Sequence, residues 1–161
     1  MTIQATTVPT PLGDFALLVR DDVLIAAGFG SIDDQASRLP DEELVRQPDL
    51  GRFSDAITAY FAGDVHAIDD LPVAQSGGDF RQAAWKVMRE VPAGETISYA
   101  ELASRAGSAK AVRAAGSACS RNMVALVVPC HRIVSTGSAG LGGYYYGLPT
   151  KEWLLAHERT A

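Results

Sequence analysis

Pro129 is followed directly by Cys130, His131 and Arg132. The thiolate is the reactive form of cysteine, and an imidazole or a cation beside a thiol lowers its pKa. The two valines before this group are typical of a buried strand, and a proline ends a strand because it has no N–H to donate. We therefore expect Cys130 in a turn at a strand end, with His131 beside it as a base. A buried cysteine that only fills space in the core is the competing interpretation.

Charge divides the chain into two parts of opposite sign. Residues 1–78 hold four basic and thirteen acidic residues, whereas residues 79–161 hold ten basic and six acidic residues. No acidic residue lies between Glu101 and Glu152. The basic residues between these two glutamates are Arg105, Lys110, Arg113, Arg121, Arg132 and Lys151. A basic stretch without acids is typical of a phosphate-binding surface, although an ordinary solvated surface can have the same composition.

Composition limits the classes of protein that fit. The chain has 161 residues, of which 47% are hydrophobic and 20% charged, which excludes a disordered chain. No apolar run is long enough to span a membrane, and no leader of basic and then apolar residues is visible. Two cysteines, Cys119 and Cys130, are too few for a disulfide framework or a four-cysteine zinc site. We expect a cytoplasmic protein without metal or cofactor.

The first part of the chain predicts a small sheet with helices. Residues 3–8, 15–19 and 23–29 have the character of strands, and the short turns between them imply an antiparallel arrangement. Residues 31–38 and 54–61 are expected as helices, with the rest of 31–50 as a loop. The polar and glycine-rich residues 75–78 suggest a linker, so we place domains at 1–75 and 76–161.

The second part predicts helices with a helix-turn-helix. Asp79 is the expected N-cap of a helix over 80–91, and Ser98 and Glu101 form a capping box for the next helix. After a turn at Gly107, Ser108 is expected to cap a helix over 109–120. That helix is rich in alanine, as a tightly packed core helix would also be, but its lysine and arginines favour a nucleic-acid surface. The fold class predicted is therefore α+β.

The C-terminal residues carry two further signals. Tyr144, Tyr145 and Tyr146 lie between glycines, an arrangement that suits stacking on a flat ring. A last helix is expected over 149–159. Glu158 lies near its end, where the helix dipole disfavours a carboxylate, so a specific partner is expected for it.

Residues 79–158 resemble the catalytic domain of the O6-alkylguanine-DNA alkyltransferases, also called methylated-DNA–protein-cysteine methyltransferases. The matching motifs occur in the family's order: Ser98-Tyr99, Ala111-Val112-Arg113-Ala114-Ala115-Gly116, Asn122, Pro129-Cys130-His131-Arg132, Leu141-Gly142-Gly143-Tyr144, Gly147-Leu148, Lys151-Glu152-Trp153-Leu154-Leu155 and Glu158. The N-terminal region resembles the family's ribonuclease-H-like domain in its pattern of strands and helix only.

The resemblance implies DNA repair by direct reversal, in which an alkyl group moves from O6-alkylguanine in DNA irreversibly to the thiol of Cys130. His131 would act through a water as the general base, and Glu158 would orient it. Tyr99 would contact the 3′ phosphate and protonate the leaving guanine. Each molecule would act once, because a thioether is not hydrolysed.

The same resemblance implies roles for the residues around the nucleophile. The helix-turn-helix would bind duplex DNA in the minor groove, and Arg113 would replace the flipped-out base. The DNA-binding residues implied are Arg113, Tyr99, Ala114, Lys110, Ser117 and Arg121. The base pocket would be lined by Val128, Ser135, Tyr144, Tyr145 and Tyr146, and Asn122 would be a structural hinge. A monomer with no membrane partner is expected.

Two departures from the family pattern bear on function. Met123 stands where the family usually has proline, which puts the rigidity of that turn in doubt. Tyr145 and Tyr146 are bulkier than the residues usual there, so we expect Tyr146 to exclude benzylguanine. Two other classes stay open: a cysteine hydrolase, which would turn over, and a DNA-binding regulator, which would not take up an alkyl group.

Overall fold

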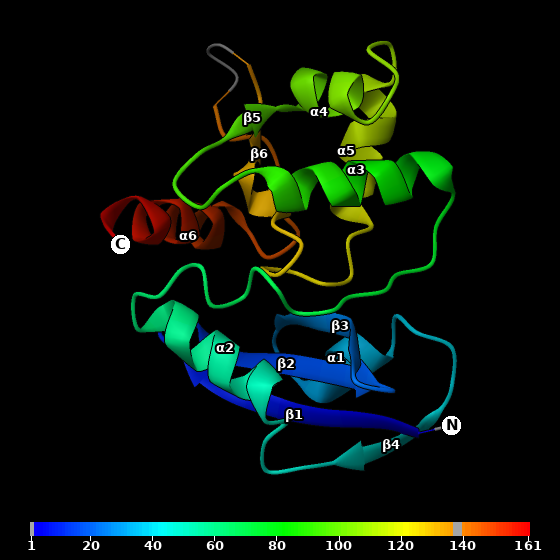
Figure 1. The fold of residues 1–161 in the computed structure, drawn as a ribbon, viewed down its shortest axis with the longest axis vertical. Coiled ribbons are helices and arrows are strands. Elements are labelled where there is room, and N and C mark those ends of the chain that lie inside the picture. Colours follow the sequence, from blue (N-terminus) through cyan, green and yellow to red (C-terminus); the bar gives the residue numbers. More distant parts are fainter. Residues whose placement is uncertain (1, 137–139) are drawn as a thin grey trace. The chain divides into compact units, whose positions relative to one another are not determined.

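The computed structural model describes residues 2–136 and 140–161. Its contacts divide the chain into two compact units (Figure 1). The first contains the residues up to Gln75 together with Met123–Val127, and the second contains Ser76–Asn122 and Val128–Ala161. The short segment 123–127, which the sequence places inside the second part of the chain, therefore belongs structurally to the first unit.

The first unit is built on a four-stranded sheet in the order β3-β2-β1-β4. Strands β1 (Thr2–Thr10), β2 (Gly13–Arg20) and β3 (Val23–Phe29) pair antiparallel through short turns, as predicted. Strand β4 (Glu43–Arg46) pairs parallel with β1, so the sheet is mixed and the expected loop after residue 38 is wrong there. Only Leu44 of β4 packs against the core, which leaves little alternation in the sequence to reveal it.

Helices cover the two faces of this sheet. In Figure 1, α2 (Arg52–Phe61) lies in front of the strands and α1 (Ile32–Ala36) lies behind them. Alternate residues of β2 point to opposite faces, and both sets are buried. The core on the α1 side contains Ile3, Ala5, Ala16, Leu18, Ile25, Ala26 and Ile32. Helix α1 is shorter than the predicted 31–38, because Ser31 is its N-cap and Ser37 its C-cap.

The segment 123–127 is attached to the edge strand β3 by backbone hydrogen bonds. The Ala27 N–H donates to the Met123 carbonyl oxygen at 2.8 Å, and the Ala125 N–H donates to the Ala27 carbonyl oxygen at 2.9 Å. The segment then turns, with Leu126 at a φ of 73°. The buried strand expected at 127–128 is therefore wrong: these valines are buried in a turn, and burial rather than strand pairing explains their apolar character.

The second unit is mostly helical. It contains α3 (Asp79–Glu90), α4 (Tyr99–Arg105), α5 (Val112–Ser120) and α6 (Leu148–Thr160). A two-stranded parallel pair, β5 (Ile97–Ser98) and β6 (Ile133–Val134), lies among them, and the short 3₁₀ helix η1 (Cys130–Arg132) leads into β6. The Trp85 indole N–H donates to the Ala118 carbonyl oxygen at 2.9 Å and so joins α3 to α5.

The predicted N-caps of two helices in the second unit differ from the structure, and the predicted N-cap of a third agrees with it. The N-cap of α3 is Gly78, and Asp79 is already helical, where its carboxylate suits the first turn. The Ser98 hydroxyl accepts a hydrogen bond from the Glu101 N–H at 3.0 Å, as predicted, while the Glu101 carboxylate forms an ion pair with Arg105. Helix α5 begins at Val112 rather than at 109, because the chain first makes a turn in which the Ala111 N–H donates to the Ser108 carbonyl oxygen.

Candidate active site

Cys130 is the first residue of η1, where the chain leaves the turn that precedes Pro129. Its N–H donates to the Val128 carbonyl oxygen at 2.9 Å, and the Asn122 side-chain amide donates to the same oxygen at 2.8 Å. These bonds fix the backbone just before the cysteine. The residue is 7% exposed, and it forms no disulfide with Cys119. The predicted turn around Cys130 is present, although η1 rather than a strand end forms it.

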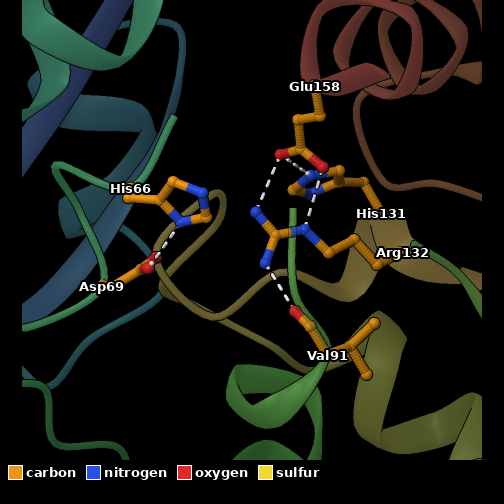
Figure 2. Close-up of polar contacts among 6 residues, drawn as sticks. All are labelled: His66, Asp69, Val91, His131, Arg132 and Glu158. Atoms are coloured by element: carbon orange, nitrogen blue, oxygen red, sulfur yellow. Dashed lines mark hydrogen bonds and ion pairs between the residues drawn. The ribbon is translucent and has the colours of Figure 1, made fainter. Parts of the chain in front are cut away.

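Three buried charged or polar side chains form one cluster, which Figure 2 shows with the Glu158 carboxylate facing both His131 and Arg132. His131 Nε2 lies 2.7 Å from Glu158 Oε2. Arg132 donates from Nε and Nη2 to the two carboxylate oxygens at 2.9 Å each, and from Nη1 to the Val91 carbonyl oxygen at 2.8 Å. Glu158 thus has two partners, of which Arg132 was not foreseen.

The charge states follow from burial and from these contacts. Burial lowers the pKa of His131, and this outweighs the opposite effect of the Glu158 charge. Burial alone would raise the pKa of Glu158, but His131 and Arg132 hold it well below the usual range of a glutamate. We therefore assign a neutral imidazole beside a carboxylate whose charge is balanced by Arg132.

The tautomer of His131 is set by this arrangement. A carboxylate only accepts hydrogen bonds, so Nε2 carries the proton and donates to Glu158. The other ring nitrogen, Nδ1, is buried and has no hydrogen-bond partner within the described part of the chain. Its lone pair is therefore available to accept a proton, which is what a general base needs.

The Cys130 thiol faces a cavity of about 600 Å³. The cavity is lined by Tyr99, Val112, Arg113, Gly116, Cys119, Ser120, Cys130, Ser135, Gly142, Gly143, Tyr144 and Tyr145. A volume of this size is in the usual range for small-molecule sites, which is roughly 300–1,000 Å³. Helix α5 supplies one wall, and the loop that contains Gly142 and the tyrosines supplies another.

Tyr99, at the start of α4, is held against that loop. Burial, followed by the charges of the two cysteines, raises the pKa of Tyr99 to about 12, while a hydrogen bond from the Gly143 backbone acts in the opposite direction. A Cβ on Gly142 would lie 2.8 Å from the Tyr99 hydroxyl oxygen and 3.0 Å from the Ser135 hydroxyl oxygen. Gly142 also has a φ of 75°, so both its conformation and its surroundings require glycine.

Many of the residues expected at the site line this cavity, and two others are buried next to the nucleophile in the chain or paired with that neighbour. Cys130, Tyr99, Arg113, Ser135, Tyr144 and Tyr145 line the cavity. His131 and Glu158 are buried and do not line the cavity. Ala114 and Ser117 line a separate hollow of about 370 Å³ with Gly78, Phe80 and Arg81. Lys110 lies in the turn before α5 rather than on the helix, and Arg121 is the exposed C-cap residue of α5.

Two of the predicted pocket residues do not line the cavity. Val128 is buried in the turn before Pro129, where its carbonyl oxygen is a hydrogen-bond acceptor. Tyr146 packs edge to face against Tyr144 and Tyr145, with ring centroids 5.8 and 4.9 Å away, and does not itself line the cavity. Of the two tyrosines that are bulkier than the family pattern, Tyr145, which is 63% exposed, is the one that lines the cavity.

The sequence reasoning missed Lys151 as a member of the site. It is fully buried, and its ammonium group donates to the carbonyl oxygens of Ile133, Leu141 and Gly143. A signal for it existed. Lys151, Leu154, Leu155 and Glu158 recur at helical spacing and form the buried face of α6, so two charged residues share a stripe with two leucines.

Neither a metal site nor a membrane span stands out in the parts of the chain that the structure describes. Over residues 2–136 and 140–161, no cluster of three or more histidine, cysteine, aspartate or glutamate side chains could hold a metal ion. No helix in those ranges is long and apolar enough to cross a membrane.

In comparison with known proteins, each of the two parts of the chain matches a domain family. Residues 3–75 match the model of the 6-O-methylguanine DNA methyltransferase ribonuclease-like domain, and residues 79–160 match that of its DNA-binding domain. A constitutive methylated-DNA–protein-cysteine methyltransferase of Bacillus subtilis is 36% identical over 96% of this chain and 94% of its own length. The human protein of that name is 36% identical over 97% of this chain and 80% of its own.

A solved structure also resembles this chain over nearly its whole length. The crystal structure of Mycobacterium tuberculosis OGT in complex with DNA has a TM-score of 0.83 and 31% identity, and the match covers 98% of this chain and 93% of that one. The predicted α+β fold is confirmed, with a ribonuclease-like N-terminal domain before a mostly helical DNA-binding domain. The chain belongs to the methylated-DNA–protein-cysteine methyltransferase family, whose members repair DNA by transferring alkyl groups to a cysteine.

Proposed function

We propose that this protein repairs DNA by direct reversal, moving the alkyl group of an O6-alkylguanine to the thiol of Cys130 once and irreversibly. The observation that carries the proposal is the position of that thiol. It faces a cavity large enough for a nucleobase, and next to it in the chain is a buried histidine whose Nδ1 has no hydrogen-bond partner among the described residues. This arrangement suits a nucleophile that must lose its proton inside a protein interior.

His131 is the proposed general base. Its Nδ1 accepts the thiol proton through a bound water, while Nε2–H stays on the Glu158 carboxylate. The Cys130 sulfur then attacks the alkyl carbon, a sulfur–carbon bond forms, and the carbon–O6 bond breaks with its electron pair going to guanine. Glu158 and Arg132 keep the imidazole in the tautomer that this step requires.

Tyr99 is the proposed proton donor to the departing guanine. Its pKa, raised to about 12 mainly by burial, keeps the phenol protonated at neutral pH. Because guanine carries negative charge as the carbon–O6 bond breaks, a neutral donor at the cavity wall stabilises the transition state more than the ground state. Tyr99 would also contact the 3′ phosphate of the flipped nucleotide. Ser135, Tyr144 and Tyr145 would contact the base.

DNA would be bound through α4 and α5 in the minor groove. Arg113 is exposed and adjoins the cavity, as a side chain must if it replaces the extruded base. Lys110, Ala114, Ser117 and Arg121 would contact the backbone and groove around it, with Asn122 holding the following turn. In this proposal residues 76–161 form the catalytic DNA-binding domain, residues 1–75 form the N-terminal domain, and the protein acts as a cytoplasmic monomer.

The test is a mass measurement on protein incubated with a duplex that contains O6-methylguanine. One methyl group is expected on the peptide that contains Cys130, with one event per protein molecule. Cys130→Ser should take up no methyl group, whereas Cys119→Ser is the matched control that leaves the acceptor in place. Repeated turnover would instead indicate a hydrolase, and DNA binding without methyl uptake would indicate a regulator.

A further inference from the structure

Lys151 is a buried cation at the base of the cavity wall. Its side chain on α6 is fully buried, and it takes part in no ion pair among the residues that the structure describes. Burial of an ammonium group is unfavourable unless hydrogen bonds replace its hydration. Burial accordingly lowers the pKa of Lys151, while negative charge on Cys130 or Cys119 acts in the opposite direction.

Three backbone carbonyl groups take the place of water around this ammonium. Nζ donates to Ile133 at 2.7 Å, to Leu141 at 2.6 Å and to Gly143 at 3.1 Å. Ile133 follows η1 directly, whereas the other two acceptors belong to the loop that lines the cavity. A lysine ammonium has three donors on one atom, which matches three acceptors that converge on one point. Lys151 thus joins β6, the strand that follows the nucleophile's 3₁₀ helix, to the cavity loop.

Gly142 and Gly143 connect Lys151 to Tyr99, the proposed proton donor. The Gly143 carbonyl accepts from Lys151, and the Gly143 backbone also hydrogen-bonds to the Tyr99 hydroxyl. Gly142 packs so tightly on Tyr99 and Ser135 that no Cβ would fit. Nζ lies 5.9 Å from the centroid of the Tyr99 ring as well. A shift of the loop would therefore move the wall against which a base must lie.

We propose that Lys151 is a positioning residue for alkyl transfer, one that fixes the Gly142–Gly143 wall and the Tyr99 hydroxyl against the guanine. The proposal deepens the proposed function and rests on it. Lys151 itself does not line the cavity, so it acts through the loop. Its charge favours the anionic thiol in every reaction of Cys130, but the wall matters only when a base must be held in line with the sulfur.

Two reactions of Cys130 separate these effects. Methyl transfer from an O6-methylguanine duplex needs the wall, whereas alkylation by iodoacetamide needs only the thiolate. In Lys151→Met we expect the loss of rate in methyl transfer to exceed the loss with iodoacetamide by about tenfold or more, as for a misplaced reacting group. Lys151→Arg keeps the charge but spreads its donors over a planar group, so it should keep the iodoacetamide rate and still transfer methyl slowly.

Lys86→Met is the matched control, because Lys86 is exposed on α3 and its loss removes the same charge from the same unit. Backbone amide exchange over residues 140–147 gives a readout that is independent of DNA. It should become at least about tenfold faster in Lys151→Met and in Lys151→Arg, and stay unchanged in the control.

Equal losses in the two reactions, or unchanged exchange in the loop of folded Lys151 variants, would overturn the positioning role. Global unfolding is recognised separately, because exchange then also rises in α3. If wild-type Cys130 takes up no methyl group, the proposed function fails, and the exchange measurement still decides whether Lys151 holds the wall.

Discussion

The substitution Glu158→Gln tests the tautomer on which the mechanism depends. The wild-type carboxylate accepts a bond from His131 Nε2 at 2.7 Å and two bonds from Arg132 at 2.9 Å. A glutamine amide of nearly the same shape has one oxygen and one NH₂ group, so one of these donors must face another donor. If the NH₂ group faces His131, the imidazole reverses its tautomer, Nδ1 becomes protonated and the base is lost.

The magnitude follows from two separate consequences. Loss of a positioned general base costs typically 10²–10⁴-fold in rate, so we expect methyl transfer to slow by about 100-fold or more. The Arg132 guanidinium keeps only neutral acceptors, the Val91 carbonyl and the glutamine oxygen, and breaking a buried charge pair costs about 3–5 kcal/mol of unfolding free energy. That is a large part of the roughly 5–15 kcal/mol that stabilises a typical domain, so the assay must run well below the melting temperature.

The pH dependence of stability gives an independent check. The folded-state pKa of Glu158 is lowered, so its contribution is fully present above the ordinary pKa of a glutamate, about 4.3, and is lost as the pH falls through the lower folded value. Wild type should therefore lose unfolding free energy below about pH 4.3 more steeply than Glu158→Gln does.

The assay is single-turnover methyl transfer at neutral pH, together with binding to an unmodified duplex to confirm that the variant is folded. Glu152→Gln is the control, because Glu152 is exposed on the same helix and its loss changes the charge equally. A folded Glu158→Gln protein that transfers methyl at the wild-type rate would refute the role of the His131 tautomer.

Two further predictions concern the cavity. Arg113→Ala should slow transfer from duplex DNA by at least about tenfold more than reaction with free O6-methylguanine, where no base must be flipped; equal losses in the two assays would contradict the role of Arg113 in flipping. Tyr145→Gly should speed the reaction with free benzylguanine by about tenfold and leave methyl transfer within about threefold, because pocket fit of this kind is worth roughly 1–3 kcal/mol. Tyr146→Gly is the control and should change neither rate appreciably, whereas acceleration only in Tyr146→Gly would restore that residue as the one that excludes bulky groups.

Periodicity recovered the elements that bury one continuous apolar face. The three antiparallel strands and α6 were recognisable because their apolar residues alternate or recur at helical spacing. Periodicity failed to predict segments that are buried without pairing in a sheet, and a strand that pairs without being buried. Val127 and Val128 are apolar, as residues of a buried strand are, yet they lie in a turn. That turn follows Leu126, which has a positive φ, and the sequence contains no glycine there that would have indicated it. Strand β4 failed for the opposite reason, since it pairs while remaining mostly exposed.

For the site, the sequence identified groups that are adjacent in the chain and some that are remote. Cys130 and His131 stood out as neighbours, and Glu158 as a carboxylate at an unfavourable helix end. The bidentate contact of Arg132 with Glu158 spans 26 residues and depends on how α6 packs on η1, which no local pattern encodes. Tyr145 and Tyr146 could not be told apart because adjacent residues in a loop have no fixed period, so only the folded loop shows which ring meets the cavity.

Met123 shows how one departure from the family pattern is compensated in three dimensions. A proline there would fix φ but would offer no N–H. Methionine has one, and it donates to the Gln75 side-chain oxygen at 2.7 Å, while the Met123 carbonyl oxygen accepts from Ala27. The chain on the N-terminal side of the cysteine is thus restrained by hydrogen bonds to the two peptide groups that flank the Met123 Cα, in place of a restricted dihedral angle. Reintroducing proline would restore that restriction and leave the Gln75 oxygen without this donor, so rigidity at this turn depends on Gln75 and Met123 together.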